Sequence, residues 1–509
     1  MNDEKNQSPA PEAGVIRHVL VLGAGSAGLM AALALRRRAP ELEVTVVRSP
    51  DLGVIGVGEG TTSAFPRFVF DLLKLKPKDF YLQVQPTWKL GLRFLWGPRP
   101  EFYYTFEQEL TAQPPDLERE AGYYCDLDET LPPTGTATAL MMADRAMLRQ
   151  PTGGPDLQRP HAFHMENKKL VQWLEATSRT LGVTIIDGLV EEVETGPEGV
   201  AALKLDGGRT LRADFYVDCS GFRSELAGKA LAEPFDSFAD TLFCDRAVIG
   251  GWERGEEAIR PYTTCETMDN GWCWRIDHEH FINRGYVFSS SFVSDDAATE
   301  ELLRKNPQIT TTPRVVKFRS GRLRRPWVKN VLALGNAAGF VEPLEATSLQ
   351  VIGTTAANFA DTLHASAGRP TPSLIRLFNK HHAGLWDDIR DFLAVHYRYN
   401  TRLDTPFWQH CREKTALHGA EEIVAYYQEN GPLRQAAQHA LSRDNSFGVE
   451  GYYAMFVGQC VPHRRPHAAS DKERQLWKKR SDSFAQQAAR ALTVAEALKF
   501  VRDPKLRWG

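Results

Sequence analysis

The segment from His18 to Arg38 constrains the fold most: an apolar run, the spacing Gly23-x-Gly25-x-x-Gly28, and then a helical pattern. Glycines spaced this way between a strand and a helix permit a tight turn, close approach of a pyrophosphate and close helix–strand packing. The helix N-terminus then faces the phosphates with free N–H groups. The segment therefore predicts an α/β dinucleotide-binding fold. The expected contacts are Gly23, Ala24, Gly25, Ser26, Ala27 and Gly28.

The same segment has an alternative interpretation as a signal peptide or membrane span, since Val19 to Leu35 is almost wholly apolar and three arginines follow. The glycine spacing argues against it. With 42% hydrophobic and 25% charged residues and a net charge of −3, the composition is that of a soluble protein. Seven cysteines form no C-x-x-C pair, which disfavours zinc and disulfides. We expect a cytoplasmic protein with no metal and no nucleic-acid or membrane partner.

Two later segments repeat the strand-to-glycine pattern, Ala213–Leu226 and Trp327–Ser348. Such junctions suit a second and third approach of the backbone to FAD, although ordinary β–α turns are the alternative. After the strand Glu43–Val47, the position that often carries a ribose-binding acid is Arg48. Arg48 either favours a 2′-phosphate or is simply exposed.

The pattern along the 509 residues predicts three parts: a disordered tail (1–14), an FAD-binding domain (15–365) and a helical substrate-binding subdomain (366–509). Pro/Gly-rich loops inserted at about 100–165 are expected either to cover the substrate pocket or to be a surface excursion. Helices are expected near Ala139–Leu148 and at Asn167–Leu181, Ser373–Tyr397, Gly419–Glu429 and Asp471–Leu498.

The stretch Pro86–Phe94 alternates apolar and polar residues, which predicts one strand with a single apolar face. Lys89 lies either on a solvent-exposed face with no special role, or on a half-buried strand as a functional lysine. The strand pattern alone leaves both open.

Together these segments resemble the flavin-dependent halogenases of the tryptophan halogenase type, in a divergent branch. They run in the family order from about residue 18 to 460. The matching pieces are "GAGSAGLMAA", "IGVGEGTTSAFPR", "TWKLGLRF", "ADFYVDCSGFRSEL", "GWCWRI", "GFVEPLEATS" and "HYRYNTRLDTPFW".

The resemblance implies a Rossmann-like FAD domain of the GR2 flavin monooxygenase type with mixed sheets, plus a mainly helical C-terminal subdomain. It implies that FADH2, O2 and chloride or bromide yield hypohalous acid, which passes through a tunnel to Lys89. Glu345 matches the glutamate that holds the lysine and accepts the proton from the ring. The alternative for Glu345 is a helix N-terminal acid favoured by the dipole.

Further site residues follow from the resemblance. It assigns cofactor contacts to Gly58, Glu59, Gly335, Phe340 and Leu344, and halide contacts to the backbone amides of Thr347 and Ser348. It assigns the flavin-side signature W-x-W-x-I to Trp272, Trp274 and Ile276, for which aromatic core packing is the alternative. The departures from the family pattern are Leu29, Arg48, Asp277, Asn336 and Ser348.

Candidate substrate-facing aromatics are Tyr103, Tyr104, Phe106, Tyr452 and Tyr453, each with core packing as the alternative. The expected substrate is an electron-rich indole, phenol or pyrrole, free or bound to a peptide or carrier. A separate NAD(P)H-dependent flavin reductase is expected to supply FADH2, and a homodimer is allowed. The alternatives are a flavin-dependent aromatic hydroxylase and a non-catalytic FAD-binding scaffold.

Overall fold

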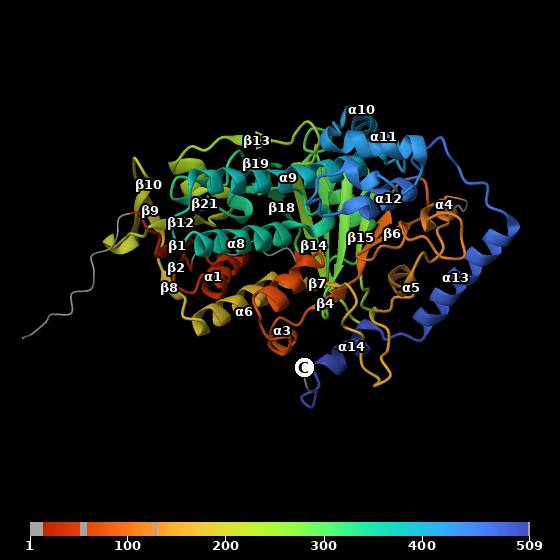
Figure 1. Cartoon of the computed structure of the whole chain (residues 1–509), viewed down its shortest axis with the longest axis horizontal. Helices are drawn as coiled ribbons and strands as arrows, with labels where there is room; N and C mark the ends of the chain where they lie inside the picture. Colours follow the sequence, from red (N-terminus) through yellow and green to blue (C-terminus); the bar gives the residue numbers. More distant parts are fainter. Residues whose placement is uncertain (1–13, 51–58, 127–129, 507–509) are drawn as a thin grey trace, which may run out of the picture.

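The computed structural model describes residues 14–50, 59–126 and 130–506. The predicted tail, apart from Gly14, and the predicted cofactor residue Gly58 lie outside these ranges. Figure 1 shows the nucleotide-binding sheet at one end, helices α8 and α9 crossing the centre, and the later helices at the other end.

A six-stranded sheet forms around the glycine motif in the order β20-β21-β12-β1-β2-β8, parallel except for β20. Its strands are β1 (His18–Leu22), β2 (Glu43–Arg48), β8 (Thr184–Asp187), β12 (Phe215–Asp218), β20 (Trp327–Val328) and β21 (Val331–Ala333). Because strand side chains alternate, Val19 and Val21 pack on helices, whereas Leu20 and Leu22 pack against a small sheet on the other face.

The helices on the first face are α1 (Ser26–Arg38), α6 (Asn167–Thr180) and α8 (Ser348–Ala365), with α1 contacting both others. The small sheet on the second face contains β9 (Val190–Gly196), β10 (Gly199–Leu205) and β11 (Thr210–Leu211). The apolar stretch Val19–Leu35 is thus a core strand and a buried helix. Within the described residues, no helix combines the length and apolar character that crossing a membrane requires.

A seven-stranded mixed sheet forms the second layer, in the order β18-β14-β17-β16-β15-β5-β6. Its strands are β5 (Gly91–Leu95), β6 (Phe102–Thr105), β14 (Arg246–Glu253), β15 (Thr263–Met268), β16 (Gly271–Asp277), β17 (Phe281–Phe288) and β18 (Arg314–Lys317). One face packs on the C-terminal helices, and the other packs on α7 (Asp295–Lys305).

Two further three-stranded sheets complete the strands. The first contains β3 (Glu59–Gly60), β7 (Ala162–Met165) and β4 (Thr87–Lys89). The second contains β13 (Phe235–Ser237), β19 (Gly321–Leu323) and β22 (Gly339–Phe340). Short helices lie at α2 (Ala64–Pro66), η1 (Arg67–Leu72), α3 (Pro77–Gln83), α4 (Ala121–Cys125) and α5 (Thr136–Met142).

The single strand expected at Pro86–Phe94 is wrong. The chain divides at Leu90 into β4 and β5, which belong to different sheets. Leu90 donates its backbone N–H to the carbonyl of Pro261, and β5 pairs in parallel with β15. Pairing with residues that are distant in sequence therefore divides this segment into two strands. Neither β4 nor β5 exposes the lysine to solvent, because Lys89 is 0% exposed.

The C-terminal part is helical, as expected. It contains α9 (Pro372–Tyr399), α10 (Pro406–Lys414), α11 (Glu421–Asn430), α12 (Gly448–Gly458), α13 (Asp471–Ala489) and α14 (Val494–Val501). The stretch expected as one helix, Asp471–Leu498, breaks because Thr493 starts α14 with a capping box. Helix α14 then contacts β4, so the chain end returns to the lysine strand. The expected helix near Ala139–Leu148 begins earlier and ends at Met142.

Gly285 gives a test of the seven-stranded sheet. A Cβ there would lie 1.9 Å from the ring of Trp274, its cross-strand partner. Overpacking of this kind costs about 1–3 kcal/mol, so we expect Gly285→Ala to lower the free energy of unfolding by that amount in urea titrations. Gly196→Ala, whose Cβ would meet no described atom within 4 Å, is the control. Equal stability of the two variants would contradict the packing described here.

Candidate active site

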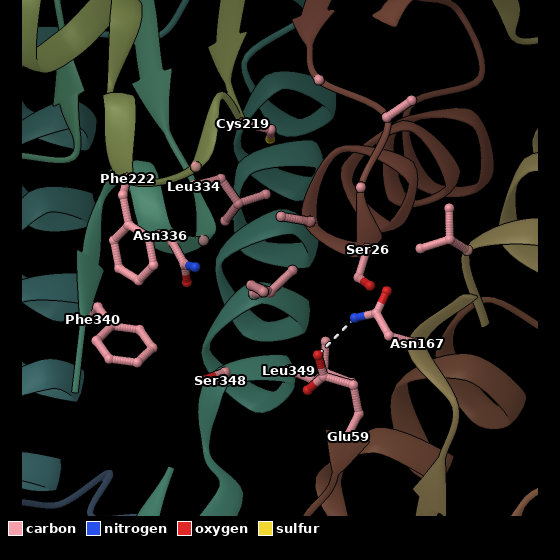
Figure 2. A pocket seen from close by; sticks show the side chains of 18 of the residues that line it. Ser26, Glu59, Asn167, Cys219, Phe222, Leu334, Asn336, Phe340, Ser348 and Leu349 are labelled. Carbon is pink, nitrogen blue, oxygen red and sulfur yellow. Dashed lines mark hydrogen bonds between the residues drawn. The ribbon is translucent and has the colours of Figure 1, made fainter. Parts of the chain in front are cut away.

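One cavity of about 1100 Å³ connects the glycine motif with Lys89. The three strand-to-glycine junctions meet at it: Gly23–Ala27 after β1, Cys219–Arg223 after β12, and Leu334–Asn336 after β21. Figure 2 shows Ser26, Asn167 and Glu59 along one wall and Phe222, Asn336 and Phe340 along the opposite wall. Trp274, Ile276, Cys265 and Lys89 also line this cavity.

The three glycines of the motif have different roles. Gly23 has φ +111, a conformation that L side chains rarely adopt. A Cβ at Gly28 would lie 1.8 Å from the carbonyl oxygen of Gly23, so only glycine lets the helix pack there. A Cβ at Gly25 would meet nothing within 4 Å among the described residues, and Gly25 lines the cavity. The space at Gly25 is where a pyrophosphate would approach the backbone.

Polar atoms aimed at the cavity lack protein partners. Ser26 Oγ and Asn167 Oδ1 are buried without a hydrogen bond to any described residue, although buried polar atoms are normally paired. Asn167 Nδ2 donates to Glu59 Oε1 at 2.7 Å, and burial raises the pKa of Glu59. These groups fit the hydroxyls and phosphates of a bound dinucleotide.

Arg48 is neither free for a 2′-phosphate nor simply exposed. Its guanidinium donates to Glu175 at 2.8 Å and to Asp187 at 2.7 Å. The hydrogen bond with Asp187 raises the pKa of Arg48. Because two carboxylates already pair with Arg48, the cavity fits a dinucleotide without a 2′-phosphate, as FAD is.

Lys89 lies at the far end of the cavity with few polar neighbours. Its Nζ donates to the carbonyl of Thr61 at 3.0 Å and lies 5.6 Å from the centre of the Phe106 ring. Burial lowers the pKa of Lys89 to about 8, partly offset by the charge of Glu345. A fraction of this amine is therefore neutral near neutral pH, unlike that of an exposed lysine.

Glu345 is buried and has a strained backbone, with φ +72. Its Oε1 contacts Nε2 of His396 at 3.0 Å. His396, on α9, was not singled out from the sequence, although it opens the segment "HYRYNTRLDTPFW". The only sequence feature that could have indicated it is a histidine on the apolar face of a long helix. Such a histidine is usually just a core residue with its hydrogen bonds made.

The residues predicted to hold halide lie at the start of α8. Ser348 is the first residue of this helix and lines the cavity, and Thr347 precedes it. The first turn of α8, which is fully described, carries no acidic side chain, and the Thr347 side chain does not cap it. N–H groups of a first turn have no partner within their helix.

The W-x-W-x-I residues share one face of β16, toward the C-terminal helices. Trp274 and Ile276 line the cavity. Trp272 Nε1 donates to Glu342 Oε1 at 2.9 Å. Burial raises the pKa of Glu342 to about 7. Asp277, a departure from the family, is paired with Arg275 at 3.0 Å.

The other predicted residues divide by location. Glu59, Gly335 and Phe340 line the cavity, whereas Leu344 is in the hydrophobic core. The Tyr104 hydroxyl interacts electrostatically with Glu345.

The remaining predicted aromatics differ in their contacts. Phe106 faces Lys89, whereas the Tyr103 hydroxyl donates to Glu101 at 2.9 Å. Tyr452 packs on Phe392, with ring centres 5.0 Å apart. Tyr453 packs on Tyr427 and donates its hydroxyl to the carbonyl of Leu433 at 2.5 Å. The substrate-facing roles of these side chains stay predictions.

Comparisons with known proteins decide the family. The model of the family "Tryptophan halogenase" matches residues 18–474. The tryptophan 7-halogenase KtzQ of Kutzneria sp. (strain 744) is 33% identical over 445 residues, 82% of this chain and 83% of KtzQ. The chain belongs to the tryptophan halogenase family.

Solved structures agree with this assignment. The crystal structure of MibH, a lanthipeptide tryptophan 5-halogenase, has a TM-score of 0.88 at 38% identity, covering 97% of this chain and 96% of MibH. BrvH, a flavin-dependent halogenase from Brevundimonas sp. BAL3, has a TM-score of 0.83 at 30% identity, covering 96% and 99%. The predicted fold and the prediction of an FADH2-dependent halogenase are confirmed.

Gly25 allows cofactor binding to be separated from folding. We expect Gly25→Ala to leave the melting temperature of the cofactor-free halogenase unchanged, because the added methyl meets no described atom, and to weaken FAD binding about tenfold or more, because it enters the phosphate space. Fluorescence titration with FAD measures the affinity. The matched variant Gly28→Ala should instead lower the melting temperature. Normal FAD affinity of Gly25→Ala would contradict the assignment of this space.

Lys89 lowers the stability of this halogenase at neutral pH. Because its pKa is about 8 in the folded chain and 10.5 ordinarily, the unfolded chain binds more protons between these values, and stability rises with pH there. Below pH 8 the buried ammonium costs up to about 3 kcal/mol. We therefore expect Lys89→Met to be more stable than wild type at pH 7.

Urea unfolding at several pH values measures this difference, which should shrink between pH 8 and 10.5. Lys229→Met, at a lysine whose side chain is 59% exposed, is the control and should show no such dependence. A constant difference between wild type and Lys89→Met would contradict the lowered pKa.

Proposed function

We propose that this halogenase transfers chlorine or bromine to an electron-rich aromatic ring through Lys89, with Glu345 as the base. The observation that carries the proposal is the continuous cavity from the glycine motif to a fully buried lysine. The cavity supports the prediction of an internal route, with Trp274, Ile276 and Cys265 in its wall.

The groups facing this cavity support the cofactor prediction. Gly25 leaves room for the pyrophosphate, and Ser26, Asn167 and Glu59 offer hydrogen bonds to the sugar and phosphates. With O2 and a halide ion, bound FADH2 supplies hypohalous acid. The amides of Thr347 and Ser348 hold the halide at the N-terminus of α8, where the helix dipole favours an anion.

Lys89 receives the hypohalous acid at Nζ, by hydrogen bonding or as a haloamine. A hydrogen bond can come from the ammonium, whereas a haloamine needs the neutral amine, and burial makes both forms of Lys89 accessible near neutral pH. Phe106 lies beside Lys89, and Trp274 and Ile276 are in the cavity wall; these apolar groups limit the escape of the oxidant into bulk water. Glu345 then accepts the proton from the halogenated ring carbon.

The substrate we propose is the indole of a tryptophan side chain within a peptide. KtzQ acts on tryptophan, and MibH, at 38% identity, is a lanthipeptide halogenase. Free tryptophan, phenols and pyrroles are the other options. The sequence carries no second nucleotide motif for NAD(P)H, which agrees with a separate flavin reductase as partner.

The test is a multiple-turnover reaction with FAD, NADH, a generic flavin reductase, O2 and either chloride or bromide. Tryptophan-containing peptides, free tryptophan and phenols are offered in parallel, and mass spectrometry detects halogen isotope patterns. We expect halogenated indole from wild type and none from Lys89→Ala, while Lys229→Ala retains activity. Hydroxylated product independent of halide would instead identify a hydroxylase.

A further inference from the structure

His396 is a buried histidine in direct contact with the proposed base. Its side chain is 0% exposed. The imidazole is surrounded by the rings of Phe94, Trp96 and Phe392, with centres 5.5, 6.4 and 4.8 Å away. Its two nitrogens face two different oxygen atoms, and these contacts determine how many protons the ring carries.

The first nitrogen must be a donor. Nδ1 lies 2.9 Å from the carbonyl oxygen of Phe392, and a carbonyl can only accept. Nδ1 therefore carries a hydrogen, an assignment made from its partner. The second nitrogen, Nε2, lies 3.0 Å from Glu345 Oε1. One further proton must lie between them, giving either an imidazolium with a carboxylate or a neutral imidazole with a carboxylic acid.

Three features favour the charged form. Glu345 precedes the N-terminus of α8, where the dipole stabilises a negative charge. The Lys89 charge interacts with the same carboxylate. Aromatic rings around the imidazole suit a cation. Burial opposes charge, but it acts less strongly on an ion pair in direct hydrogen-bond contact than on a lone ion.

We infer that His396 is a positioning residue, an imidazolium that keeps Glu345 ionised and aimed for proton removal from the halogenated ring. The inference rests on the proposed role of Glu345. His396 does not carry the proton onward, because Nδ1 ends at a carbonyl within its own helix. The proton must therefore leave Glu345 by a route that does not pass through His396.

The proton balance then closes between two side chains. The Lys89 ammonium gives a proton to the hydroxide that leaves hypohalous acid, which forms water. The ring carbon gains the halogen and gives its proton to Glu345, and the C–H electron pair restores the aromatic ring. Glu345 then releases this proton and the Lys89 amine takes one up, which restores both groups. The sum converts aromatic C–H and hypohalous acid into aromatic C–halogen and water.

Other titratable groups around Glu345 do not change this balance. Besides Lys89 on β4 and His396 on α9, groups that interact with it include Tyr104 on β6 and Cys265 on β15. Burial raises the pKa of both well above their usual values, so they remain neutral. Lys89 and His396 thus both interact with Glu345.

The direct test is nuclear magnetic resonance of the full chain labelled with ¹⁵N-histidine. The difference between wild type and His396→Phe isolates the His396 signals. We expect both ring nitrogens to be protonated in wild type at pH 8, and the ring to become neutral with hydrogen on Nδ1 in Glu345→Gln. A neutral ring in wild type, or the same signals in both proteins, would overturn the inference.

A kinetic test separates this role from simple packing. We expect His396→Phe to slow single-turnover halogenation about tenfold or more and to move the acidic limb of the rate–pH profile up by about one unit. His396→Gln, which still donates a hydrogen bond, should recover part of the rate. An acidic limb that stays in place in His396→Phe would show that the residue only packs.

The matched control is His382→Phe on the same helix. His382 is also buried, at 2% exposed, but its Nδ1 contacts Thr355 Oγ1 and not a carboxylate. It should change neither the rate nor the pH limb. The resonance test needs no substrate, so it decides the protonation of His396 even where the halogenation assay fails. Halogenation by wild type with an unshifted pH limb in His396→Phe would refute only this inference.

Discussion

The burial of one amine, that of Lys89, is the constraint on which the site depends. An ammonium group removed from water needs compensation, and the structure provides little of it: the Thr61 carbonyl, the face of Phe106 and the nearby charge of Glu345. The lysine consequently lies between its charged and neutral forms. The guanidinium of Arg48, by comparison, is paired with two carboxylates. An amine paired in that way would stay charged and would react poorly with an electrophile.

The cost of this arrangement is spread over the neighbouring elements. Glu345 adopts a left-handed backbone, which costs of order 1–3 kcal/mol and persists only where the surroundings enforce it. Here the enforcing contacts are the imidazole of His396 and the start of α8. Ser26 and Asn167 at the other end of the cavity keep polar atoms unpaired. Both kinds of local cost, a left-handed backbone and unpaired buried polar atoms, therefore occur at this site, as is common at functional sites.

The sequence predicted what local chemistry determines. The strand, turn and helix at Gly23–Gly28 and the helix at Asn167 follow from glycine spacing and periodicity, because neighbouring residues decide them. The break at Leu90 could not be predicted, since the partner of β5 is β15, which begins at Thr263. The pairing of His396 with Glu345 likewise joins residues 51 positions apart. Lys89 and Glu345 were found by family resemblance and not by any local signal.

Four of the five departures from the family pattern divide into two kinds once their contacts are known, and the fifth, Leu29, is in the hydrophobic core. Arg48 and Asp277 are each held in ion pairs that leave no charge free for a ligand. Ser348 and Asn336 are uncharged and line the cavity, as Arg48 also does. Ser348 places a hydroxymethyl group at the first position of α8, where the helix offers N–H groups to an anion. Divergence of function in this branch should therefore be sought first at Ser348, because its side chain adds both bulk and a polar group beside the proposed halide position.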